Sequence, residues 1–290
     1  MTKKTNADLK EAYNQAHSDP SFWTLPTADI TEAVVDLMDW SGKTVLEIGC
    51  GDGLTSRELA KVKVGAFPVI GYDYSEEAIR RARESMTAEL REKGGLQRCT
   101  YVVGSVPEVA EGCEPPTYDV VLAQEVLEHM DDPGQSLKDW AQYVKPGGHL
   151  IITCPSFLNP RGIVWMTLQV LLDVPMSLTD LHFINVWDMA KWSKDAGLVL
   201  KNMKSIRHDV GWGDLMVDDL RKRLNNALAD RGIAFVSDGE GERPYIRDEF
   251  HPAVDRFLIW LRQASGFMDP RAKVMTGACS LYVMQKPEEA

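Results

Sequence analysis

Runs of aliphatic and β-branched residues alternate along the chain with stretches in which apolar residues recur at helical spacing, beginning near Lys43. This alternation is typical of a parallel sheet with helices on its faces, so we predict an α/β protein. Ser75, followed by two glutamates, is the expected N-cap of one of the helices. The apolar runs predict strands at 44–48, 68–73, 100–103, 118–123, 149–153, 198–206 and 278–284. The helical period predicts helices at 55–62, 75–93, 133–143 and 186–196.

Two parts of the chain lie outside this alternation. Residues 1–40 precede the first expected strand, and residues 208–277 separate the last two. The second part contains helical stretches joined by an acidic, polar loop, so we interpret it as an insertion and not as an independent domain. We therefore expect a core formed by 41–207 and 278–286, a helical cap at 1–40 and an inserted helical cap at 208–277.

Composition excludes several classes of protein. The chain has 290 residues, of which 44% are hydrophobic and 26% charged, a balance typical of globular proteins. Its 32 basic and 43 acidic side chains give a net charge of −11, which argues against binding nucleic acid through bulk charge. No apolar run reaches the roughly 18 residues of a membrane-spanning helix, and the N-terminus lacks the apolar segment of a signal peptide, so we expect a cytoplasmic protein. Five cysteines without a Cys-x-x-Cys pair argue against a disulfide framework or a thiolate zinc site.

A glycine-rich turn, Val45-Leu-Glu-Ile-Gly-Cys-Gly-Asp-Gly53, joins the first expected strand to a helix. Glycines at this point let the backbone approach a ligand at the carboxyl edge of the sheet. The dinucleotide fingerprint requires a third glycine at the sixth position, but counting from Gly49 that position is Leu54, which argues against NAD. Glu47 suits a ligand that carries an ammonium group, and Asp73, at the end of the next strand, can accept both hydroxyls of a ribose. The sequence therefore predicts a nucleotide-like cofactor site.

Five sequence blocks follow one another in a fixed order between Lys43 and Lys204: VLEIGCGDG, GYDYS, VVGSV, YDVVLAQEVLEHM and VKPGGHLIITCPS. In this order they resemble the class I S-adenosylmethionine-dependent methyltransferases. The resemblance implies a Rossmann-like sheet of seven strands, mostly parallel, with an antiparallel last strand. Ser105 stands where the family often has an aspartate. The implied cofactor contacts are Glu47, Gly49 and Gly51 at the methionine part, Asp73 at the ribose, Tyr74, Ser105 and Val106 at the adenine, and Gln124 beneath the sulfonium.

A second group of polar residues, Glu125-Val-Leu-Glu-His129, comes directly after the fourth expected strand. One helical turn would gather Glu125, Glu128 and His129, because residues three and four apart share a helix face. Two carboxylates and an imidazole can bind a divalent metal or hold a general base. Alternatively, Glu128 and His129 only cap and orient the loop. His182, which follows the fifth strand, is a further candidate ligand.

A Glu-x-x-Glu-His block with a later histidine resembles the plant small-RNA 2′-O-methyltransferases and the ubiquinone-pathway O-methyltransferases. This resemblance implies that Glu125, Glu128, His129 and His182 bind a divalent ion that holds the acceptor oxygens. The mixed oxygen and nitrogen ligands suit Mg, Mn, Fe, Co or Zn. A bound ion would lower the pKa of an acceptor hydroxyl, and His129 and His182 are the expected catalytic residues.

We interpret the chain as an S-adenosylmethionine-dependent methyltransferase that acts on a hydroxyl group of a small-molecule acceptor. The alternatives are methylation of the 2′-hydroxyl at an RNA end, methylation of nitrogen, and a cofactor-binding partner subunit without activity. The charge of −11 and the lack of a dense Lys/Arg cluster argue against RNA, because phosphate contacts need local positive charge. A complete cluster of acids and histidine at the acceptor edge argues against an inactive subunit. No motif specifies the acceptor or the oligomeric state, since caps and surfaces determine both.

Overall fold

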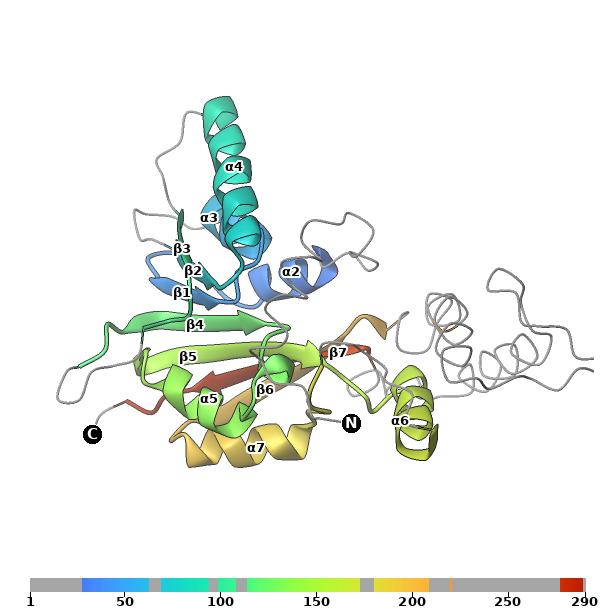
Figure 1. Cartoon of the computed structure of the whole chain (residues 1–290). Coiled ribbons are helices and arrows are strands. Elements are labelled where there is room, and N and C mark those ends of the chain that lie inside the picture. Colours follow the sequence, from blue (N-terminus) through green and yellow to red (C-terminus); the bar gives the residue numbers. More distant parts are fainter. Residues whose placement is uncertain are drawn as a thin grey trace, which may run out of the picture. The chain divides into compact units, whose positions relative to one another are not determined.

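The structure, a computed structural model, describes residues 28–62, 69–93, 99–107, 114–172, 180–208, 220 and 277–288. Its strands form one seven-stranded sheet in the order β3-β2-β1-β4-β5-β7-β6 (Figure 1). The predicted strands are confirmed to within a few residues, and β5 begins earlier than expected. The strands are β1 (Val45–Ile48), β2 (Val69–Asp73), β3 (Cys99–Val103), β4 (Tyr118–Gln124), β5 (Val144–Pro155), β6 (Val199–Ile206) and β7 (Cys279–Gln285).

The helices of the described segments follow the predicted pattern, with one addition. The sequence analysis assigned no helix between 153 and 186, where the structure has α6 (Pro160–Leu172). A short 3₁₀ helix, η1 (Leu127–His129), follows β4. The remaining helices are α2 (Ala28–Val35), α3 (Leu54–Val62), α4 (Glu76–Lys93), α5 (Pro133–Ala141) and α7 (Val186–Asp195).

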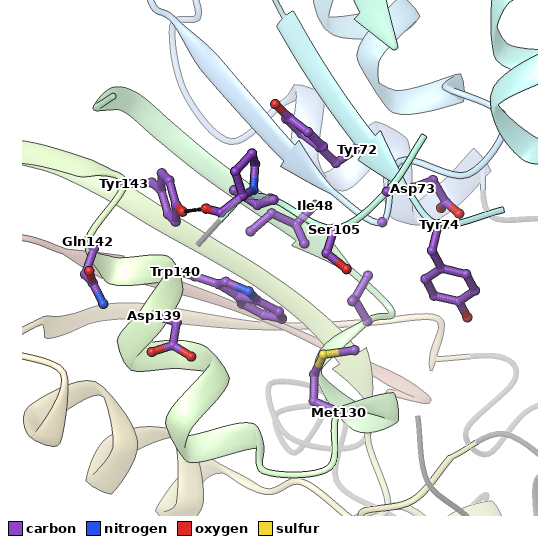
Figure 2. A pocket seen from close by; sticks show the side chains of 15 residues that line it. Ile48, Tyr72, Asp73, Tyr74, Ser105, Met130, Asp139, Trp140, Gln142 and Tyr143 are labelled. Carbon is purple, nitrogen blue, oxygen red and sulfur yellow. Dashed lines mark hydrogen bonds between the residues drawn. The ribbon is translucent and has the colours of Figure 1, made fainter. Parts of the chain in front are cut away.

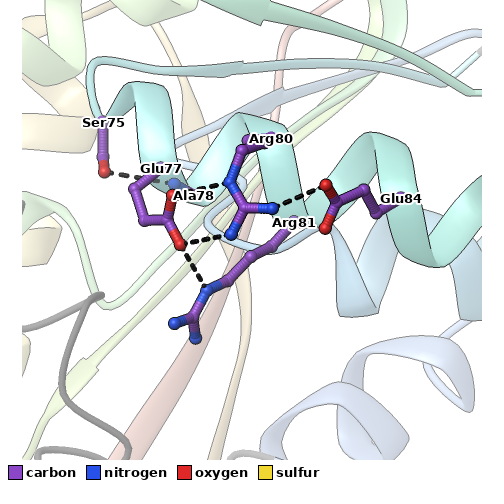
Figure 3. Close-up of polar contacts among 6 residues, drawn as sticks. All are labelled: Ser75, Glu77, Ala78, Arg80, Arg81 and Glu84. Carbon is purple, nitrogen blue, oxygen red and sulfur yellow. Dashed lines mark hydrogen bonds and ion pairs between the residues drawn. The ribbon is translucent and has the colours of Figure 1, made fainter.

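The start of α4 shows how local sequence fixes the end of a helix. Ser75 Oγ accepts a hydrogen bond from the amide of Ala78 at 3.2 Å, which confirms the predicted cap (Figure 3). On the exposed side of the helix, Arg80 lies between Glu77 and Glu84 and pairs with both. Hydrogen bonds from Arg80 and Arg81 lower the pKa of the Glu77 carboxyl to about 2. These ion pairs stay at the surface, whereas the cap sets where the helix begins.

The sheet reverses its strand order at β1, and this reversal determines where a ligand can bind. β1 pairs in parallel with β2 on one side and with β4 on the other, so the connections leave β1 in opposite directions. In open α/β sheets a ligand binds at the carboxyl ends of the strands at such a switch point. Val45, Leu46, Val120, Val121 and Leu122 of β1 and β4 are buried because both faces of the sheet are covered.

The last strand runs against the others, as predicted. The amide of Gly147 donates to Lys286 O at 3.0 Å, and farther along β5 the amide of Ser156 donates to Ala278 O at 2.9 Å. Residue numbers therefore rise along β5 while they fall along β7, and the arrows of the two strands point in opposite directions in Figure 1. The fold is the predicted mostly parallel sheet with an antiparallel last strand.

The chain divides into two compact units. The first consists of Met1–Pro155, Thr179–Met203 and Leu281–Ala290, and the second of Ser156–Leu178 and Lys204–Ser280. Of the predicted N-terminal cap, α2 is described, while 1–27 lie outside the described residues; so does most of the predicted cap at 208–277. The predicted domain boundaries therefore stay predictions. None of the described helices is long and apolar enough to cross a membrane.

Candidate functional site

A cavity of about 480 Å³ lies at the carboxyl ends of β1 and β2 in the first unit (Figure 2). Five of the eight predicted cofactor residues line it: Gly49, Asp73, Tyr74, Ser105 and Val106. Met130, Trp140 and Tyr143 contribute the opposite wall, and none of these three residues was predicted. In the sequence, the helical spacing of Trp140 indicates no more than a core residue. The fold brings it to the edge of the sheet, where it lines the cavity.

Asp73 is fixed at the end of β2 by two backbone amides. Its Oδ2 accepts from the amide of Gly51 at 2.9 Å, and its Oδ1 accepts from the amide of Ser75 at 2.8 Å. Figure 2 shows Asp73 and Tyr74 next to each other at the cavity. Each carboxylate oxygen has a second lone pair, so the fixed side chain can still accept hydrogen bonds from two neighbouring hydroxyls.

The glycine turn needs glycine for two different reasons. Gly49 has a φ of +67°, and a Cβ there would lie 2.4 Å from Cγ2 of Val126. Gly51 also has a positive φ, +53°, but a Cβ there would meet no described atom within 4 Å. Gly49 therefore lets the turn pack against the loop after β4, whereas Gly51 leaves open space beside the carboxylate of Asp73.

Glu47 lies beneath the glycine turn and is not among the residues that line the cavity. Its side chain is 2% exposed, and the hydroxyl of Ser56 on α3 donates to Oε2. Burial, together with the negative charges of Asp52 and Asp73, raises the pKa of this carboxyl to about 7, although the hydrogen bond from Ser56 acts in the opposite direction. Its predicted contact with the methionine part of a cofactor stays a prediction.

Gln124, the last residue of β4, lies next to the glycine turn. The preceding Ala123 pairs with Ile48 of β1, which leads directly into Gly49. The Gln124 Nε2 donates to Oγ1 of Thr55 at 3.0 Å. Its Oε1 is buried and has no hydrogen-bond partner within the described segments.

Glu125 follows β4 in a strained backbone conformation. Its φ is +52°, which is uncommon for a residue with a side chain. Thr153 of β5 holds it twice: the amide of Glu125 donates to Thr153 O at 2.9 Å, and Thr153 Oγ1 donates to Glu125 Oε1 at 3.0 Å. The turn at Glu125 leads the chain from β4 into η1.

The cluster at η1 consists of Glu128, His129 and Asp180. His129 Nε2 lies 3.7 Å from Glu128 Oε1, and His129 Nδ1 lies 3.6 Å from Asp180 Oδ1. Each of the three residues offers one atom that could bind a metal, and these three atoms all lie within 4.8 Å of one another. The amide of Leu181 donates to Glu128 O at 2.9 Å, which ties the segment of Asp180 to η1.

The structure thus gathers Glu128 and His129 of the predicted metal ligands and adds Asp180. The carboxylate of Glu125 is engaged with Thr153. His182 does not belong to the group of three, although its Nε2 is buried without a hydrogen-bond partner among the described residues. Asp180 was not among the predicted ligands. In the sequence, only its position two residues before His182 pointed to it.

Comparisons with known proteins agree with this geometry. A family model described as "Methyltransferase domain" matches residues 26–202. The ubiquinone biosynthesis O-methyltransferase of Alkalilimnicola ehrlichii is 32% identical over 201 residues, which are 66% of this chain and 76% of the relative. That of Dechloromonas aromatica is 32% identical over 208 residues, 68% of this chain and 85% of the relative. The chain belongs to the class I S-adenosylmethionine-dependent methyltransferases.

A solved structure supports the fold of this methyltransferase independently. A chain in the complex of the Haloferax volcanii Trm112 methyltransferase activator with a methyltransferase superposes with a TM-score of 0.59 at 17% identity, covering 99% of both chains. At this identity the likeness concerns the fold alone.

The lining of the cavity suits S-adenosylmethionine, the cofactor of the family. Asp73 offers carboxylate oxygens at the cavity, and Ile48, Val106 and Trp140 line it with apolar side chains. The contacts of these residues with a ribose and an adenine stay predictions. The carboxylate of Asp73 also favours a ligand that carries positive charge on its sulfonium and ammonium groups. The glycine turn lacks the dinucleotide fingerprint, which argues against NAD.

The electrostatics of the cluster of Glu128, His129 and Asp180 differ from those of the cavity. Burial and the charges of Glu125 and Asp180 hold the pKa of the Glu128 carboxyl well above its usual value. Glu128 Oε2 has no hydrogen-bond partner in the part of the chain that the structure describes. The neutral form of Glu128 is therefore favoured more strongly than in an exposed glutamate, and His129 lies between Glu128 and Asp180.

Proposed function

We propose that this methyltransferase transfers the methyl group to an aromatic hydroxyl of a small molecule, such as a catechol. The observation that carries the proposal is the cluster that Asp180, from the segment before α7, forms with Glu128 and His129, which follow β4. A hydroxyl must lose its proton to attack a methyl sulfonium, and this cluster offers a base with an acid partner. The names of the relatives, ubiquinone biosynthesis O-methyltransferases, support oxygen as the acceptor atom.

The residues divide the work of the reaction. S-adenosylmethionine supplies a methyl group bonded to positively charged sulfur. The cavity holds the cofactor through Asp73, and the loop with Gly49 brings its methionine part beside the end of β4. His129 takes the proton from the acceptor hydroxyl, and Asp180 at 3.6 Å stabilises the imidazolium that forms. The transfer itself requires mainly alignment of the acceptor oxygen with the methyl group.

The same cluster fits a divalent cation. Donor atoms that share one cation bonded at 2.0–2.6 Å are separated by roughly 3–5 Å, and the three groups already lie within 4.8 Å of one another. The unpartnered Oε2 of Glu128 supplies a further oxygen. As the alternative to proton transfer by His129, we propose that Glu128, His129 and Asp180 hold such an ion, with His182 nearby along the chain. A bound cation would lower the pKa of the acceptor hydroxyl.

The proposal is tested by methyl transfer from labelled S-adenosylmethionine to catechols, to matched anilines and to a short RNA. We expect product with catechols only. His129→Ala and Asp180→Asn should each lower turnover at least a hundredfold, a typical effect of removing a general base, while binding of S-adenosylhomocysteine stays unchanged. His149→Gln, in β5, is the matched control. Methylation of anilines but not catechols would overturn the choice of oxygen.

The metal is tested separately with EDTA and elemental analysis. If the cluster holds an ion, EDTA abolishes turnover without weakening S-adenosylhomocysteine binding, and one divalent metal restores it. Asp180→Asn and His129→Ala should then lose bound metal. Full activity in EDTA together with an inactive His129→Ala protein would reject the metal and leave His129 as a general base.

A further inference from the structure

A chain of side-chain hydrogen bonds joins helix α2 to the end of β4. Oγ1 of Thr31 on α2 lies 2.8 Å from Oγ1 of Thr55 on α3, and Nε2 of Gln124 donates to the same Thr55 oxygen at 3.0 Å. Thr31 and Thr55 are each only 4% exposed. The hydroxyl of Thr55 therefore links three elements, α2, α3 and β4.

In the structure, the amide of Gln124 turns its nitrogen toward Thr55 and its oxygen away from α3. An amide nitrogen can only donate, and Thr55 Oγ1 accepts its hydrogen, so Oε1 is turned away from α3. This Oε1 is buried and has no partner among the described residues. A buried carbonyl oxygen without a hydrogen bond costs free energy, which argues that its partner arrives with a ligand.

The neighbourhood identifies the ligand group that this oxygen fits. Gln124 directly follows the residue paired with Ile48, so it lies beside Gly49 at the turn expected to hold the methionine part of the cofactor. That part carries an ammonium group, which has only donors and a positive charge. A carbonyl oxygen oriented in advance is its natural acceptor.

We propose that Thr31 and Thr55 are positioning residues for the cofactor: they hold the Gln124 amide so that Oε1 accepts a hydrogen bond from the cofactor ammonium. Helix α2 then contributes to cofactor binding through Thr31 without touching the cofactor. The proposal rests on the cofactor of the family and not on the proposed acceptor.

The test compares two ligands by titration calorimetry on the full chain. S-adenosylhomocysteine carries the ammonium group, whereas 5′-methylthioadenosine keeps the adenosine and sulfur but lacks the amino acid end. Thr55→Val is nearly isosteric and should weaken S-adenosylhomocysteine roughly tenfold, the range of one hydrogen bond to a charged group, with no change for 5′-methylthioadenosine. Thr55→Ser should restore the affinity, and Thr167→Val on α6 is the control threonine.

Two outcomes overturn the proposal. Equal weakening of both ligands would mean that Thr55 supports the adenosine site or the fold, and unchanged affinity for S-adenosylhomocysteine would mean that the amide needs no support. Thr31→Val tests the same chain of hydrogen bonds from α2 if Thr55→Val fails to fold. It should weaken S-adenosylhomocysteine alone, by about threefold, because it acts through a second hydrogen bond. Neither ligand requires an acceptor, so the result is independent of the proposed O-methylation.

Discussion

At the residue scale, the buried carboxyl of Glu47 makes the stability of the fold depend on pH. Its carboxyl lies in the core beneath the glycine turn with a pKa of about 7 instead of its usual 4.5. Below about pH 4.5 the group is protonated in both the folded and the unfolded chain. As the pH rises, the unfolded chain loses this proton first, so the free energy of unfolding falls between about pH 4.5 and 7 and stays lower above that range.

Glu47→Gln should remove this dependence, because the amide cannot ionise and its oxygen can still accept from Ser56. Relative to the original protein, the variant should gain roughly 2–3 kcal/mol of unfolding free energy between pH 5 and pH 8, the equivalent of the raised pKa. Urea unfolding of both proteins without cofactor at the two pH values measures it. The same difference in stability at both values would show that Glu47 is not held in its neutral form.

The residue scale also separates what the sequence predicts from what it leaves out. Gly49 and Asp73 could be predicted because each combines a residue type with a place at a strand end. Asp180 could not, since its contact with His129 depends on how the segment after β5 returns to η1. Burial of Glu47 away from the cavity is likewise a result of packing against α3, which no local pattern encodes.

At the scale of elements, a capped helix end contributes more than an exposed ion pair. Ser75→Ala removes the acceptor for the amide of Ala78 and should lower the free energy of unfolding by about 1 kcal/mol. Arg80→Ala removes two exposed ion pairs on the same helix and should cause no measurable change, because solvent screens them. Thermal or urea unfolding of both variants provides the comparison, and a larger loss for Arg80→Ala would reverse this ranking.

Most elements could be predicted because the spacing of their apolar residues, and the residues at their ends, match the environment that each element has in the fold. The strands of the sheet centre read as short apolar runs since both faces are covered, and Ser75 marks the start of α4. Helix α6 was not predicted because its sequence, Pro160–Leu172, is apolar on nearly every side and gives only a weak amphipathic period.

At the scale of the whole molecule, the cofactor site is confined to one of two units. A ligand that binds only the folded form stabilises it by mass action, by about 2.7 kcal/mol at a hundred times its dissociation constant. We expect S-adenosylhomocysteine at that concentration to raise the melting temperature of the unit containing the cavity by roughly 5–10 °C, and NAD to leave it unchanged. If the two units melt separately, only one transition should move.

Asp73→Asn makes this prediction specific to the site. The substitution removes the carboxylate that the amides of Gly51 and Ser75 hold at the cavity, and an amide cannot accept through both of its end atoms. Affinity for S-adenosylhomocysteine should fall at least tenfold, so at the same ligand concentration the stabilisation should drop by about 1.4 kcal/mol or more, roughly half of its original value. Differential scanning calorimetry of both proteins across a range of S-adenosylhomocysteine concentrations measures the change. An unchanged concentration dependence in Asp73→Asn would remove Asp73 from the cofactor site, since mass action ties the shift in melting temperature to the affinity alone.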